Sequence, residues 1–101
     1  MFIALIDFHV SASDRPRALA ALRAEAAEAR AMPGNLGYRF FVDPDSATHV
    51  GIHHEWARAE DFAAYAASAL FARVGLELRP LMTAPPMSRR LSAEVYNTVR
   101  G

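Results

Sequence analysis

The chain contains no cysteine among its 101 residues. It therefore cannot form a disulfide framework, use a thiolate nucleophile, or hold zinc or an iron–sulfur cluster through cysteine. An excess of charge is also missing, because 11 Lys and Arg residues balance 11 Asp and Glu residues. This balance argues against nucleic acid and anionic membranes as partners, since both are bound through basic surfaces.

Long apolar runs and recognisable targeting or catalytic motifs are absent as well. No run reaches the roughly 20 apolar residues that span a bilayer. The apolar stretch 1–10 has no basic region or cleavage site and includes Asp7 and His9, so we expect no signal peptide. There is no glycine-rich phosphate loop and no HExxH motif. We therefore predict a cytoplasmic protein with a single domain over residues 1–101.

Hydrophobic periodicity divides the chain into alternating strands and helices. Strand patterns cover residues 2–10, 36–42, 49–56 and about 90–96, and helical patterns cover 18–32, 59–69 and 69–81. This order is typical of the α+β, ferredoxin-like βαββαβ fold, a four-stranded antiparallel sheet with the helices on one face. We further expect strands 2–10 and 49–56 to be neighbours and to run parallel.

Charged residues on the first helix are interpreted as a solvated face. They lie mostly off the apolar stripe of Leu19, Leu22, Ala26 and Ala29. The charged residues concerned are Arg17, Arg23, Glu25, Glu28 and Arg30. Asp14 or Ser13 is expected to cap this helix, and Ser68 the third one.

The segment His49–Trp56 concentrates three histidines, a glutamate and the only tryptophan of the chain. Successive side chains of a strand point to opposite faces. One face therefore carries Val50, Ile52, His54 and Trp56, and we expect it to meet the core together with Phe2, Ile6 and Phe8. The other face carries His49, Gly51, His53 and Glu55.

That second face has no covering element in the predicted fold. It nevertheless carries Ile3, Leu5 and Phe41. An exposed apolar patch of this kind usually marks an interface. We therefore predict a homodimer formed through the sheet face.

Several motifs resemble the antibiotic biosynthesis monooxygenase (ABM) family, and particularly its quinol monooxygenases. The run 32–38, Met-Pro-Gly-Asn-Leu-Gly-Tyr, resembles the family's PGxxxY turn and strand, and Asp43-Pro44 follows it. Glu55-Trp56 matches the family's EW pair, and residues 67–71 stand where a SPHF-like segment is frequent. The segments 78–81 and 85–86 resemble the C-terminal helix and the lead-in to the last strand. The resemblance covers nearly the whole chain.

The resemblance implies a dimeric α/β barrel with a small-molecule pocket between helices and sheet in each subunit. Characterised members oxidise quinols or polycyclic phenols with molecular oxygen and no added cofactor, and others open haem. Leu70 stands where the haem-degrading members have the haem-ligating histidine, and Ile6 where they have an asparagine. Since haem iron needs an axial ligand, we expect no haem degradation and no cofactor.

The predicted catalytic residues are His54, Trp56 and Arg90. His54 would be a general base with a pKa near neutral, Trp56 an aromatic wall for a planar substrate, and Arg90 an oxyanion partner. Structural alternatives are a buried histidine bonded to a helix or to Tyr65, a core tryptophan and a surface arginine. The residues expected to bind substrate are Ile6, Phe8, Tyr38, Phe40, Phe62, Tyr65 and Phe71.

The leading functional hypothesis is a cofactor-independent monooxygenase that oxidises a quinol or hydroxylated aromatic with O₂. One alternative is a non-catalytic small-molecule-binding or stress-response dimer on the same fold. A second alternative is a metal-dependent enzyme, because histidine and carboxylate suit zinc, iron or manganese. The metal ligands would be Asp7, His9, His53 and Glu55, if the first and third strands bring them together.

Overall fold

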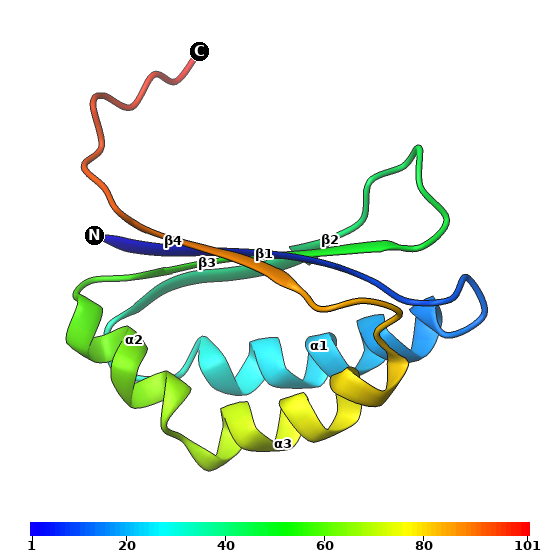
Figure 1. The fold of residues 1–101 in the computed structure, drawn as a ribbon. Helices are drawn as coiled ribbons and strands as arrows, with labels where there is room; N and C mark the ends of the chain where they lie inside the picture. The colour runs from blue at the N-terminus through cyan, green and yellow to red at the C-terminus, as the bar shows by residue number, and fades with distance from the viewer.

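In the computed structural model, which describes residues 1–101, a four-stranded antiparallel sheet carries three helices on one face (Figure 1). This confirms the predicted fold class. The strands are β1 (Phe2–His9), β2 (Asn35–Phe41), β3 (His49–Trp56) and β4 (Met87–Ser92), in the order β2-β3-β1-β4. The helices are α1 (Arg15–Ala29), α2 (Ala59–Ala66) and α3 (Ala69–Leu78), followed by a short 3-10 helix, η1 (Arg79–Leu81).

Strands β1 and β3 are neighbours, as predicted, but they run antiparallel. The predicted parallel pairing is wrong because α1 carries the chain back, so that β2 runs in the direction of β1. The β2–β3 hairpin then places β3 between them in the opposite direction. In the resulting register Ala4 lies opposite His54, and Asp7 lies opposite Gly51.

The last strand ends earlier than the predicted range of 90–96. Ser92 lies opposite Phe2, where β1 begins, so the chain beyond Ser92 has no partner strand to follow. The N–H of Ala93 donates to the carbonyl of Met1 at 2.8 Å, and the N-terminal ammonium of Met1 donates to the carbonyl of Ala93 at 2.6 Å. These two hydrogen bonds continue the pairing by one residue. The residues after it leave the sheet as an extended segment (Figure 1).

Helix boundaries follow local signals in the sequence. Helix α1 begins at Arg15 with Pro16 in its first turn, where the missing N–H group costs no hydrogen bond. Asp14 occupies the N-cap position but makes no side-chain cap. Ser68 caps α3, as predicted, by accepting a hydrogen bond from the N–H of Phe71.

The turn before β2 requires glycine at position 34. Gly34 has a φ of 80°, and a Cβ there would lie 2.2 Å from the Asp61 side chain.

The core lies between the sheet and the helices. The predicted inner faces of β1 and β3 are confirmed, since Phe8, Val50 and Trp56 are almost completely buried. The core residues are Ala4, Phe8, Val10, Ala18, Leu22, Ala26, Ala29, Tyr38, Val50, Ile52, Trp56, Phe62, Tyr65, Val74 and Leu78.

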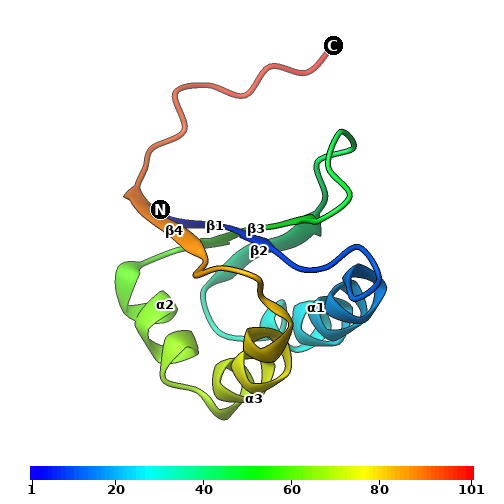
Figure 2. The same cartoon turned by 45° about the vertical axis from the view of Figure 1, so that its right-hand side comes forward.

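The predicted solvated face of α1 is wrong at Glu25, which is only 3% exposed. Figure 2 shows the cause, because α1 and α3 lie side by side on the same face of the sheet. Helix α3 covers a side of α1 that would be exposed to solvent if α1 packed against the sheet alone. The buried side of α1 is therefore wider than its apolar stripe.

None of the helices combines the length and the apolar character needed to cross a membrane.

Candidate functional site

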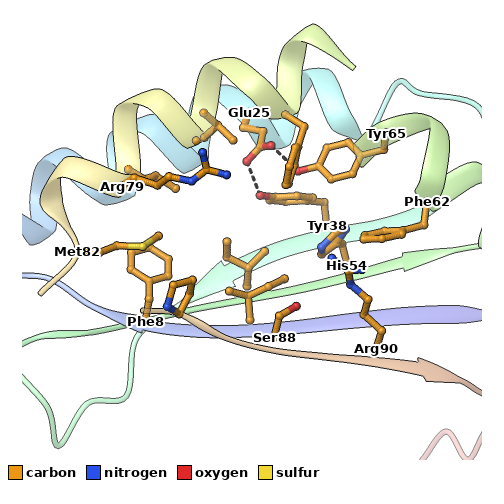
Figure 3. Close-up of a pocket in the computed structure, with 17 residues that line it drawn as sticks. Phe8, Glu25, Tyr38, His54, Phe62, Tyr65, Arg79, Met82, Ser88 and Arg90 are labelled. Atoms are coloured by element: carbon orange, nitrogen blue, oxygen red, sulfur yellow. Dashed lines mark hydrogen bonds between the residues drawn. The ribbon is translucent and has the colours of Figure 1, made fainter. Parts of the chain in front are cut away.

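A cavity of about 240 Å³ lies between the inner face of the sheet and the helices (Figure 3). An engineered apolar cavity of about 150 Å³ holds benzene, so this cavity has room for a ligand of one or two aromatic rings. Every strand and every helix contributes to its wall. The lining residues are Ile6, Phe8, Glu25, Tyr38, Ile52, His54, Phe62, Tyr65, Phe71, Val74, Gly75, Leu78, Arg79, Met82, Pro86, Ser88 and Arg90.

Eight of the ten predicted site residues line this cavity, and two do not. The eight are Ile6, Phe8, Tyr38, His54, Phe62, Tyr65, Phe71 and Arg90. Trp56 is fully buried and does not line the cavity, but it contacts two residues that do, His54 and Tyr65. Phe40 lies outside the cavity, with the guanidinium of Arg23 5.6 Å from its ring centroid. The catalytic and substrate-binding roles themselves stay predictions.

The contact between Trp56 and His54 fixes how the imidazole presents itself. The indole N–H of Trp56 donates to Nδ1 of His54 at 2.8 Å. An indole nitrogen can only donate, so Nδ1 must accept, and neutral His54 carries its proton on Nε2. Nε2 of His54 has no hydrogen-bond partner. No side-chain nitrogen or oxygen that is fully sealed from solvent lacks such a partner, so Nε2 is not fully sealed. Nε2 is therefore open to the cavity as a hydrogen-bond donor.

The charge state of His54 agrees with this arrangement. Burial, with smaller contributions from the neighbouring His53 and Arg90, lowers its pKa to about 4. The expectation of a pKa near neutral is wrong, because the imidazole lies under the helices and is 3% exposed. At neutral pH His54 is thus an uncharged donor with no free acceptor nitrogen.

A buried carboxylate that the sequence reasoning missed lies at the same end of the cavity. Both tyrosine hydroxyls donate to Glu25, that of Tyr38 to Oε2 at 2.7 Å and that of Tyr65 to Oε1 (Figure 3). Helical spacing contained the signal, because Glu25 lies three residues after Leu22 and four before Ala29, both buried.

Burial raises the pKa of Glu25, while the hydrogen bonds from Tyr38 and Tyr65 and the charge of Arg73 oppose this rise. Burial also raises the pKa of both tyrosines well above the usual value, and the charge of Glu25 adds to the effect. The two hydroxyls therefore stay protonated and keep donating to the carboxylate at any physiological pH.

Two arginines supply positive charge to the cavity. The guanidinium of Arg90 lies 4.9 Å from the centroid of the Phe62 ring and forms no ion pair within 4 Å. Arg79 is also without an ion pair, and its guanidinium points toward Glu25 in Figure 3. Both groups are free to meet negative charge on a ligand.

The four proposed metal ligands on the outer face do not come together. Asp7 pairs with His49 at 2.7 Å, and His53 pairs with Glu55 at 3.1 Å. His9 contacts the hydroxyl of Thr48 at 2.9 Å. The antiparallel register separates the two acidic residues, and no group of three or more His, Cys, Asp or Glu side chains is placed to hold a metal ion.

Comparison with known proteins relates the chain to one family. The family model described as antibiotic biosynthesis monooxygenase matches residues 1–74. No curated protein matches the sequence.

Solved structures extend the similarity over nearly the whole chain. A candidate antibiotic biosynthesis monooxygenase from Deinococcus radiodurans is 20% identical, with a TM-score of 0.91 and coverage of 100% of both chains. Rv0793 from Mycobacterium tuberculosis is 17% identical, with a TM-score of 0.85 and coverage of 97% of this chain and 100% of its own. PA3566 from Pseudomonas aeruginosa is 16% identical, with a TM-score of 0.82 and coverage of 93% and 94%. At these identities the likeness establishes the fold.

Proposed function

Since the chain belongs to the antibiotic biosynthesis monooxygenase family, we propose that it is a cofactor-independent monooxygenase that oxidises a quinol or another hydroxylated aromatic with O₂. The observation that carries this proposal is the aromatic-walled cavity with His54, Glu25 and the two tyrosines at one end. A planar phenol fits such walls, and the polar end suits its hydroxyl group.

The reaction balances without a separate reductant. A phenol with a free para position and O₂ give a para-quinone and water, so one oxygen atom enters the product and the other leaves as water. The substrate supplies all four electrons. Negative charge develops first on the phenolic oxygen and then on the reduced oxygen. In this proposal the Nε2–H group of His54 and the guanidinium of Arg90, both in the cavity wall, stabilise that charge.

Oxygen uptake tests the proposal directly. A panel of quinols and naphthols, each with one or two rings, is mixed with the protein under ¹⁸O₂, and the product is analysed for one labelled oxygen atom. We expect His54→Ala to lower kcat by roughly 10²–10³-fold, the usual effect of removing one charge-stabilising donor. His53→Ala, on the outer face of the same strand, is the matched control and should retain activity.

The competing function is a non-catalytic small-molecule-binding or stress-response dimer. Binding of panel members without any oxygen uptake would support it and would overturn the monooxygenase proposal. A cytoplasmic location also stays a proposal, which cell fractionation with an antibody to the chain would test.

A homodimer through the outer sheet face is part of the proposal. Phe41 is 47% exposed and Leu91 43% exposed on this face, where Leu91 lies opposite Ile3. The helices all lie on the other face (Figure 1), so nothing within the chain covers these side chains. A second copy of the same sheet would bury them, and the tendency of the family to form oligomers supports the same arrangement.

A further inference from the structure

We propose that Glu25 is the proton acceptor of the cavity: it takes up the proton that a phenolic ligand gives up on binding, with Tyr38 and Tyr65 holding the carboxylate and relaying the proton. This inference rests on the proposed function for the class of ligand. It assigns the base to helix α1, whereas the sequence pointed to His54 on β3.

The other titratable groups in the cavity wall are already committed as donors. Arg79 and Arg90 are permanently protonated guanidinium groups without acceptor atoms. His54 accepts from Trp56 with Nδ1 and carries a proton on Nε2. The hydroxyls of Tyr38 and Tyr65 each donate their proton to Glu25. The Glu25 oxygen atoms are therefore the ionisable acceptor left in the wall.

The surroundings of Glu25 differ from those of a structural ion pair. No cation lies within ion-pair distance of its carboxylate, since Arg73 on α3 is paired with Glu28. Its partners are two neutral hydroxyl groups, and an uncharged amide can accept from one with its oxygen and donate to the other with its nitrogen. Burial raises its pKa, so the carboxylate is a stronger base than one in water. A stronger base matches a phenol better.

The proton moves without any redox change. The ligand O–H bond breaks and a new O–H bond forms on a tyrosine oxygen, whose original proton passes to Glu25. The negative charge is thereby transferred from Glu25 to the ligand oxygen. The His54 ring lies 5.2 Å from that of Tyr38 and 5.4 Å from that of Tyr65. Its Nε2–H donor therefore shares the end of the cavity at which the phenolate forms.

The test uses 4-nitrophenol, whose anion absorbs visible light while the neutral phenol does not. Binding is followed by the fluorescence of Trp56, the only tryptophan. Proton release is measured by calorimetry in buffers of different ionisation enthalpy. All measurements are made at one pH, so that only the binding of the probe changes the protonation of the site. The other titratable groups that face Glu25 are Tyr38, Tyr65, Arg73, Glu77 and Arg79.

We expect the wild-type protein to bind the probe as the anion and to release almost no proton, because Glu25 keeps it. Glu25→Gln should either bind the neutral phenol or release about one proton for each anion bound. Glu60→Gln, an exposed carboxylate on α2, should behave as wild type. The methyl ether 4-nitroanisole, which has no proton to give, should bind without proton exchange.

Two results would overturn the assignment: a wild-type complex that holds the neutral phenol, and a wild-type complex that forms the anion while releasing the proton to buffer. Both are read on the wild-type protein and do not require a variant to fold. Failure of the probe to bind overturns it too, since the cavity then does not take phenols.

Oxygen uptake separates this inference from the proposed function. If the probe binds as the anion and the proton is retained, but no quinol is turned over, the monooxygenase proposal is overturned and Glu25 as the proton acceptor is supported. Turnover by Glu25→Gln at the wild-type kcat would support the monooxygenase proposal and overturn Glu25 as the proton acceptor. If both proposals hold, kcat falls by roughly 10²–10⁴-fold in Glu25→Gln, as for loss of a general base.

Discussion

At the scale of single residues, His54 couples the stability of the protein to pH. Its pKa is about 4 in the folded chain and near 6.5 when exposed. As pH falls from 6.5 to 4, the unfolded chain takes up a proton that the folded chain does not. The folded state therefore loses stability over this window, on the order of 3 kcal/mol, and the loss from this group levels off below pH 4.

His54→Gln should remove this part of the pH dependence while its side-chain oxygen still accepts from Trp56. Urea unfolding at pH 7 and pH 4 measures the difference. His9→Gln, at the exposed end of β1, is the control and should keep the wild-type slope. Glu25 is present in all three proteins, so its titration contributes equally to the pH dependence of each. Equal slopes for wild type and His54→Gln would contradict the prediction.

Glu25 should show the stability cost that is common for functional buried charges. Because its folded pKa is raised, the ionised carboxylate penalises the folded state at pH values above that pKa. We expect Glu25→Gln to be more stable than wild type at pH 8, with the gain disappearing as pH falls through the folded pKa. Thermal unfolding across pH measures this.

Glu25→Ala provides the contrast at the same position. It leaves the Tyr38 and Tyr65 hydroxyls without their acceptor, which costs about 1–3 kcal/mol for each unsatisfied group. A Gln variant that is as unstable as the Ala variant at pH 8 would mean that the charge stabilises the fold, against this account.

Residue patterns in the sequence indicated most of the cavity wall but missed the burial of Glu25 and the tautomer of His54. Strand alternation correctly put His54 and Trp56 on the inner face, because pleating is a local property. The tautomer of His54 is set by Trp56, two residues further along the same strand. The burial of Glu25, in contrast, depends on partners distant in sequence. Glu25 meets Tyr65 across 40 positions and is covered by α3, which no local pattern of α1 reveals.

At the scale of elements, the junction between α2 and α3 shapes one wall of the cavity. The Ser68 hydroxyl accepts from the N–H of Phe71 at 3.2 Å and donates to the carbonyl of Tyr65 at 2.6 Å. The rings of Tyr65 and Phe71 lie 5.4 Å apart on either side of this break. Ser68 therefore links the end of α2 to the start of α3, next to both aromatic side chains.

Ser68→Ala should destabilise the protein by about 1–2 kcal/mol, the cost of losing a helix N-cap. In a domain of this size the melting temperature should fall by about 4–8 °C for each kcal/mol. Ser92→Ala, at the exposed end of β4, is the control and should change little. A Ser68→Ala variant with an unchanged melting temperature would show that packing alone holds the junction.

Element order was predictable because periodicity and turn residues are local signals, whereas the strand ends were not. The direction of β3 follows from that order, since α1 makes β2 run with β1 and the β2–β3 hairpin then places β3 between them in the opposite direction. The end of β4 is determined by where β1 begins, at Phe2, some 90 residues earlier in the chain. The apolar residues Val95 and Tyr96 suggested a strand that has no neighbour to pair with.

At the scale of the whole molecule, the fold leaves one sheet face covered and the other open. The covered face holds the cavity, and its wall draws on all four strands and all three helices. The open face carries Phe41 and Leu91 beside the two ion pairs Asp7–His49 and His53–Glu55. The exposed apolar side chains lie on the edge strands β2 and β4, and the ion pairs lie on the central strands β1 and β3. An exposed apolar surface of this kind usually marks an interface.

Leu91→Asp should therefore separate the proposed dimer while leaving the cavity face intact, because Leu91 lies opposite Ile3 on the open face. Light scattering after size exclusion should give twice the 11.1 kDa chain mass for wild type and a single chain for the variant. Leu76→Asp, at a residue 76% exposed on α3, is the matched control and should stay dimeric. An aspartate within a sheet-to-sheet contact would be buried without a partner, which costs several kcal/mol and shifts the association equilibrium by orders of magnitude. A wild-type protein that is monomeric at micromolar concentration, or a Leu91→Asp variant that stays dimeric while Leu76→Asp dissociates, would place the interface elsewhere.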